Sequence, residues 1–101
     1  MENKIILITG ATSGIGRAVA SRFASMGSKL ILCGRRKEKL KILAQELGES
    51  HQLLIFDVRD KKAVFKAINS LPEDYKKIDL LINNAGNAHG MDPVQSADLD
   101  A

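Results

Sequence analysis

Apolar and polar positions along this chain follow two different periods. Four short runs are almost continuously apolar, which is typical of strands covered on both faces in a parallel sheet. These runs are Ile5–Ile8, Leu30–Cys33, Leu53–Phe56 and Ile78–Ile82. After each of the first three, apolar residues return every three or four positions, as they do on one face of a helix.

The three helical segments have boundary residues that suit them. Gly27 and Gly48 stand where the first and second segments would stop. Asp60 is a suitable N-cap for the third, and Pro72 closes it. The apolar stripes of the three helices are Ile15, Val19 and Phe23; Leu40, Leu43, Ala44 and Leu47; and Val64, Ile68 and Leu71.

The resulting order of elements is strand–helix three times over, closed by a fourth strand. Such alternation predicts an α/β fold with a doubly wound parallel sheet between two helical layers. With 101 residues the chain has room for one small domain. The stretch after residue 86 is polar and is broken by Gly90 and Pro93, so we expect a loop there.

The composition indicates the class of protein and its cellular compartment, but it says little about function. Apolar residues make up 45% and charged residues 27% of the chain, as in ordinary globular proteins. Cys33 is the single cysteine, so the sequence predicts neither a disulfide framework nor a cysteine-rich metal site, and it favours a reducing, cytoplasmic setting. No apolar stretch approaches the ~20 residues that a membrane span needs.

A glycine-rich corner follows the first strand. The stretch from Thr9 to Gly16 reads TGATSGIG. A helix that starts here offers unpaired N–H groups and the positive end of its dipole, which suit a phosphate, and glycines let the backbone approach it closely. The simpler alternative is a turn in which Thr12 or Ser13 only caps the helix. The position of the glycine-rich corner after the first strand of a β-α-β series favours a nucleotide site over a simple turn.

Two arginines follow the second strand, in LCGRR. Dinucleotide folds that bind NAD carry an acid near this point for the ribose hydroxyls, whereas here Gly34 precedes Arg35 and Arg36. Two guanidiniums can fork onto a 2′-phosphate, at roughly 1.5–3 kcal/mol for each charge-assisted bond. The alternative is that these cations only form the solvated face of the second helix. We accept that alternative for the three lysines of RRKEKLK, namely Lys37, Lys39 and Lys41.

The third and fourth strands also end in polar residues. Asp57 and Val58, in FDVRD, can lie beside an adenine, although Asp57 can equally cap a helix. Asn83 and Asn84, in LLINNAG, can bond to the sheet end or to a ribose. Because parallel strands end at the same edge, all these residues are expected near the glycine corner.

Taken together, TGATSGIG, the DV pair and NNAG resemble the short-chain dehydrogenase/reductases, from Ile5 to about Gly90. The resemblance implies a Rossmann-type sheet with strand order 3-2-1-4, an NADP cofactor, and hydride transfer between an alcohol and a ketone. Arg35 stands where NADP-using members carry a basic residue. Several of them carry another at the position of Ser13, so selectivity here rests on the arginines. The predicted cofactor-binding residues are Gly10, Thr12, Ser13, Gly14, Ile15, Gly16, Arg35, Arg36, Asp57, Val58, Asn84, Ala85 and Gly86.

Within the family, CGRR, SLPEDYKKIDLLINNAG and NAHGMDP most resemble the NADP-dependent 3-hydroxy acid dehydrogenases that oxidise serine or allo-threonine. The family's chemistry uses a Tyr-x-x-x-Lys pair with a serine, and an asparagine on the helix after the fourth strand. None has a position here, because Tyr75 precedes the fourth strand and Asp79 lies four residues on. We therefore expect residues 1–101 to be the N-terminal cofactor half of one domain, without catalytic residues and without a metal site.

The leading hypothesis is therefore the cofactor-binding part of an NADP-dependent oxidoreductase. The alternative is a stand-alone NADP-binding module without catalysis. A nucleic-acid binder is disfavoured, because the cations of RRKEKLK share their helix with Glu38 and Glu46, and few aromatic residues are present to stack on bases. The resemblance implies an alcohol or ketone substrate, a homodimer or homotetramer, and no membrane partner.

Overall fold

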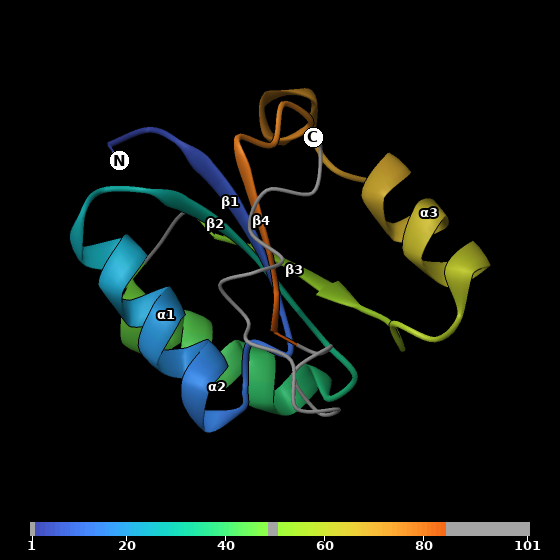
Figure 1. Cartoon of the computed structure of the whole chain (residues 1–101), viewed down its shortest axis with the longest axis horizontal. Helices are drawn as coiled ribbons and strands as arrows, with labels where there is room; N and C mark the ends of the chain where they lie inside the picture. The colour runs from blue at the N-terminus through green and yellow to red at the C-terminus, as the bar shows by residue number, and fades with distance from the viewer. Residues whose placement is uncertain (1, 49–50, 85–101) are drawn as a thin grey trace.

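The computed structural model describes residues 2–48 and 51–84. Strands and helices alternate along these residues as the apolar pattern predicts (Figure 1). The elements are β1 (Ile5–Thr9), α1 (Gly14–Ser25), β2 (Lys29–Gly34), α2 (Lys37–Leu47), β3 (Gln52–Ile55), α3 (Lys61–Asn69), the short 3-10 helix η1 (Glu73–Tyr75) and β4 (Leu80–Asn83).

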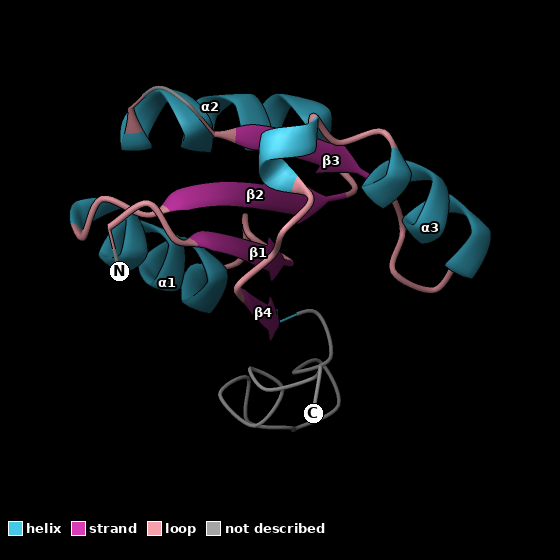
Figure 2. Cartoon of the chain, turned by 90° about the horizontal axis from the view of Figure 1, so that it is seen from above, coloured by secondary structure: helices cyan, strands magenta, loops and turns pink. Residues whose placement is uncertain are grey.

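All strand pairs of the sheet are parallel, and the strand order is β3-β2-β1-β4 (Figure 2). Ile8 of β1 pairs with Leu32 on one side and Ile82 on the other, so β1 is an interior strand. The prediction of a doubly wound parallel sheet with order 3-2-1-4 is confirmed. The carboxyl ends of the four strands consequently share one edge, where such folds bind their ligands.

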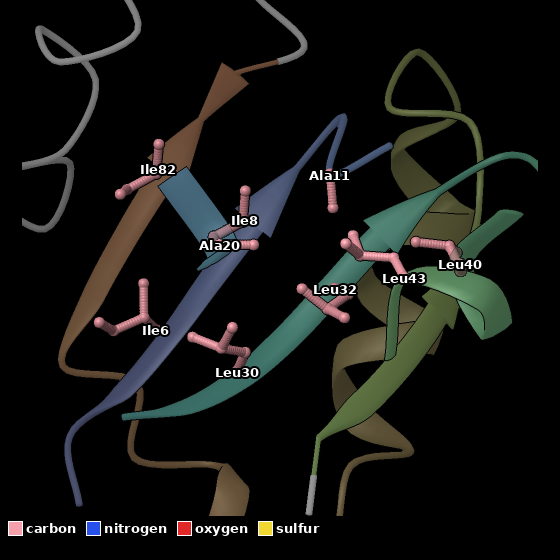
Figure 3. Close-up of a cluster of buried hydrophobic side chains, with 9 residues drawn as sticks. All are labelled: Ile6, Ile8, Ala11, Ala20, Leu30, Leu32, Leu40, Leu43 and Ile82. Atoms are coloured by element: carbon pink, nitrogen blue, oxygen red, sulfur yellow. The ribbon is translucent and has the colours of Figure 1, made fainter. Parts of the chain in front are cut away.

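Two apolar clusters hold the layers together. On one face, α1 and α2 cover side chains of β1 and β2, and on the other face α3 covers the alternate side chains of the same strands (Figure 1). Burial on both faces explains why the runs in β1 and β2 are continuously apolar. The first cluster, drawn in Figure 3, consists of Ile6, Ile8, Ala11, Ala20, Leu30, Leu32, Leu40, Leu43 and Ile82.

Most predicted helix boundaries are confirmed. In the predicted stripe of α1, Val19 and Phe23 pack against the first apolar cluster as expected, but Ile15 does not. Gly27 and Gly48 follow their helices with φ of 82° and 105°, and the Asp60 side chain accepts from the Ala63 N–H at 3.2 Å. Ile15, by contrast, is 48% exposed, while Gly16 and Ala20 are buried. The helix faces the sheet through Gly16 because that residue lies against the end of β1, which turns Ile15 outward.

The predicted loop after residue 86 lies outside the described residues. The same holds for two predicted cofactor-binding residues, Ala85 and Gly86. Among the helices that are described, none combines the length and the apolarity needed to cross a bilayer.

Candidate functional site

The corner between β1 and α1 is closed by the side chain of Ser13. Its hydroxyl accepts a hydrogen bond from the Gly16 N–H at 3.1 Å and donates one to the Gly10 carbonyl at 2.9 Å. Of the two cap candidates, Ser13 is therefore the N-cap of α1. The N–H groups of Gly14 and Ile15 remain without an intrahelical partner, because they belong to the first turn. Such groups favour an anion.

The three glycines of this corner differ in the space and the backbone conformation that they provide. A Cβ on Gly16 would lie 2.2 Å from the Gly10 carbonyl oxygen, so only glycine allows the helix to approach the strand this closely. A Cβ on Gly14 would meet nothing within 4 Å. Gly10 has a φ of 60°, the left-handed conformation that glycine adopts at low cost. The corner is therefore tight on the protein side and open at Gly14, as a phosphate cradle requires.

Asn84 fastens this corner to the end of β4. Its side-chain amide donates to the Gly10 carbonyl at 3.0 Å and to the Ser13 hydroxyl at 2.6 Å. Asn84 is buried, and its Oδ1 finds no partner within the described part of the chain. Asn83 does take the sheet-end role considered from the sequence, since it accepts from the Thr9 hydroxyl at 2.8 Å. In this structure the Asn84 amide is committed to the corner, which leaves its carbonyl oxygen for other contacts.

A cleft of about 630 Å³ opens beside the corner, at the carboxyl edge of the sheet. This volume is within the range of small-molecule and cofactor sites. The turns after β1, β2 and β3 form its walls. The predicted cofactor-binding residues that line it are Gly10, Thr12, Ser13, Arg35, Arg36, Asp57 and Val58.

The other predicted residues lie elsewhere. Gly14, Ile15 and Gly16 form the first turn of α1, and Asn84 lies behind the corner, so none of them lines this cleft. Of the lysines assigned to the solvated face of α2, Lys39 departs from the prediction because it too lines the cleft. No group of three or more metal-ligating side chains comes together among residues 2–48 and 51–84.

The carboxylate on the cleft wall already has a cationic partner. Asp57 Oδ1 accepts from the backbone N–H of Arg59 at 2.9 Å, and Oδ2 accepts from its Nη2 at 2.8 Å. These bonds, led by the side-chain ones, lower the pKa of Asp57 to about 2. Asp57 is thus not the cap of α3, a role that Asp60 fills. Sequence reasoning missed Arg59, although the spacing Asp-x-Arg after a strand is a signal for such a turn.

The arginine pair is exposed and unneutralised. Both Arg35 and Arg36 lie at the surface, and no ion pair or side-chain hydrogen bond engages either within the described residues. The cleft therefore combines a corner that can hold one phosphate with two guanidiniums that can hold a second. This combination suits a dinucleotide that carries an additional phosphate on its ribose.

Comparisons with known proteins agree with this geometry. The sulfoacetaldehyde reductase 2 of Chromohalobacter salexigens is 52% identical over 97 residues, which are 94% of this chain and 38% of that protein. The NADP-dependent 3-hydroxy acid dehydrogenase YdfG of Shigella flexneri is 43% identical over 96 residues, or 95% of this chain and 39% of that protein. The chain thus spans about two fifths of the length of these curated relatives.

Solved structures show the same fold. The closed form of a serine dehydrogenase complexed with NADP+ superimposes with a TM-score of 0.73 at 42% identity, over 76% of this chain and 31% of that one. A family model described as short chain dehydrogenase matches residues 4–101, which include every element of the sheet and the three turns of the cleft. The chain belongs to the short-chain dehydrogenase family.

Proposed function

We propose that this chain binds NADP(H) in the cleft and serves as the cofactor-binding part of an oxidoreductase. Bound there, the nicotinamide cofactor would exchange hydride with an alcohol or a ketone. The observation that carries the proposal is that one cleft extends from the edge of the phosphate corner, at Gly10 and Ser13, to two arginines that form no ion pair among the described residues. The relatives named NADP-dependent support the same cofactor.

The residues present fit that cofactor at both of its phosphate positions. The first turn of α1 offers the N–H groups of Gly14 and Ile15 to the pyrophosphate, and Gly14 leaves the space for it. Arg35 and Arg36 would take the 2′-phosphate by charge-assisted hydrogen bonds. Asp57 also lines the cleft, but its carboxylate is paired with Arg59, which offsets its repulsion of a phosphate.

The relatives support a small substrate with an acidic group. One is named for sulfoacetaldehyde and another for 3-hydroxy acids. We propose a 3-hydroxy acid such as serine, oxidised at its hydroxyl group, as the substrate. The expected homodimer or homotetramer and the cytoplasmic setting stay predictions.

The single tyrosine of the chain does not line this cleft. Tyr75 is 5% exposed and packs in the cluster under α3 with Ile5 and Leu7, so it has a structural place rather than a catalytic one. Within these 101 residues, we assign only cofactor binding and orientation. This observation also keeps open the second candidate, a stand-alone NADP-binding module.

The test is a double substitution of Arg35 and Arg36 by Ala in the full-length protein. We expect the preference for NADPH over NADH, measured as a ratio of Kd values by titration, to fall at least ten- to hundredfold. A single charge-assisted bond is worth about 1.5–3 kcal/mol, and the double variant loses more than one. Arg22→Ala is the matched control, because Arg22 is an exposed arginine in the last turn of α1. A preference that survives the double substitution would reject the arginine assignment. Absence of NADPH binding in the unsubstituted protein would reject the proposed function itself.

A further inference from the structure

The cleft wall after β2 carries a third cation. Three exposed lysines lie in or near the first turns of α2, yet only Lys39 lines the cleft together with Arg35 and Arg36. Helical geometry explains the selection. Lys39 is three residues after Arg36, the N-cap of α2, so the two lie on the same side. Lys37 and Lys41 are two residues away from Lys39 and therefore project toward the opposite side of the helix.

Nothing in the described part of the chain neutralises Lys39. None of the ion pairs recorded for residues 2–48 and 51–84 includes it. The acid further along α2, Glu46, is bound to Arg17 of α1 at 2.5 Å. Across the cleft, Asp57 is engaged by Arg59 through several hydrogen bonds. The wall consequently holds three cations, none of which forms an ion pair with a carboxylate among the described residues, although the charge of Arg35 contributes to lowering the pKa of Asp57.

Like charges that share a surface destabilise each other unless an anion lies between them. A phosphate monoester carries a charge of about −1.5 to −2 at neutral pH and offers three acceptor oxygens. Two guanidiniums and one ammonium provide both enough charge and enough donors for it. Lysine contributes as a point charge on a flexible stem, whereas each arginine contributes a planar fork.

We propose that Lys39 is a specificity-determining residue, the third cation of a subsite that binds the phosphate on the adenosine ribose of NADP(H). The inference rests on the proposed function. It extends that function by one residue, since the sequence analysis assigned Lys39 to the solvated face of the helix. In this arrangement the guanidiniums of Arg35 and Arg36 orient the phosphate oxygens, and the Lys39 ammonium adds electrostatic attraction for the phosphate. NADH, which lacks this phosphate, gains nothing from Lys39.

The test compares Lys39→Ala with Lys41→Ala in the full-length protein. Both substitutions remove one exposed lysine from the same helix, but only Lys39 lines the cleft. We expect Lys39→Ala to weaken NADPH binding about three- to tenfold and to leave NADH binding unchanged, as suits one exposed charge pair. Lys41→Ala should change neither Kd. Lys39→Arg should restore most of the NADPH affinity, and the dependence of that affinity on salt should become shallower in Lys39→Ala.

The outcomes separate this inference from the proposed function. Equal NADPH affinities for the Lys39→Ala and Lys41→Ala variants would overturn the inference, and so would an equal loss for NADPH and NADH in Lys39→Ala. In either case NADPH binding by the unsubstituted protein still decides the proposed function, and the double variant still decides the assignment of Arg35 and Arg36. If the unsubstituted protein binds NADPH without preferring it to NADH, the inference fails and the proposed binding of a nicotinamide cofactor does not. Unfolding temperatures that match among the lysine variants would exclude a loss of fold as the cause.

Discussion

The two walls of the cleft are built on opposite principles. The glycine corner is held by hydrogen bonds among Gly10, Ser13 and the buried Asn84, all of them within the protein. The wall after β2 presents exposed arginines and a lysine that no described residue pairs with. The glycine corner is thus determined by packing and internal hydrogen bonds, whereas the wall after β2 is distinguished by its positive charge. Substitutions at the packed positions of the corner should therefore affect stability and the binding of both cofactors, whereas substitutions at the cationic wall should affect only the choice between cofactors.

The largest effect is expected at Gly16. In Gly16→Ala the new methyl would lie 2.2 Å from the Gly10 carbonyl oxygen, and α1 would have to move away from β1. We expect a loss of about 1–3 kcal/mol in the free energy of unfolding, the usual cost of overpacking, together with weaker binding of both NADPH and NADH. Denaturant unfolding and cofactor titration measure the two losses.

Gly14→Ala is the matched control, because a Cβ there meets nothing within 4 Å. Its free energy of unfolding should change by no more than about 0.5 kcal/mol. Its affinity for both cofactors should still fall, since the methyl group takes space that the pyrophosphate needs. Equal destabilisation by the two substitutions would contradict the distinction between a tight and an open glycine.

A smaller effect is expected at Asn84. Asn84→Ala removes two hydrogen bonds to the corner, to Gly10 and to Ser13, and should lower the free energy of unfolding by about 1–2 kcal/mol. Asn83→Ala serves as the comparison. It removes a bond from the Thr9 hydroxyl at a half-buried position and should cost less. Thermal unfolding of both variants measures which one loses more stability. A larger loss in Asn83→Ala would show that the Asn84 hydrogen bonds do not hold the corner in place.

The smallest effect concerns the pH response of the wall after β3. Arg59 lowers the pKa of Asp57 from 3.8 to about 2, so the carboxylate stays ionised in the folded protein where the unfolded chain would bind a proton. Its contribution to stability is therefore fully present above about pH 4 and is lost as the pH falls through about 2. Near neutral pH we expect no change.

An NMR titration of the Asp57 carboxyl carbon measures this response. The midpoint should lie near 2 in the unsubstituted protein and should rise toward 3.8 in Arg59→Ala. Lys61→Ala, which removes a nearby exposed cation at the start of α3, is the control and should leave the midpoint in place. If the midpoint does not change in Arg59→Ala, the ion pair between Asp57 and Arg59 does not form in solution.

Much of the fold could be predicted because its signals are local. Continuous apolar runs identified β1 and β2, since both faces of these strands are buried. Gly27 and Asp60 marked helix ends through their own backbone and side-chain preferences. The strand order followed from the motifs that resemble a known family, and the sheet confirms it.

The remainder depends on contacts that periodicity does not contain. Ile15 occupies a stripe position, yet the approach of Gly16 to Gly10 rotates it into solvent. The pattern of RRKEKLK shows that its lysines are exposed, but only the turn before α2 determines that Lys39 reaches the cleft. For Asn84, the chain position suggested a ribose contact, but no periodic pattern indicated that its amide also bonds to a corner more than 70 residues earlier.

That long-range link has a consequence for the order of assembly. Asn84 bonds to Ser13 and Gly10 across separations of 71 and 74 residues, and closing so long a loop must precede any benefit from the contact. The corner therefore acquires its final fastening only after β4 has added to the sheet beside β1. During synthesis on the ribosome, Asn84 emerges 71 residues after Ser13, so the turn between β1 and α1 cannot receive this fastening until β4 has been made.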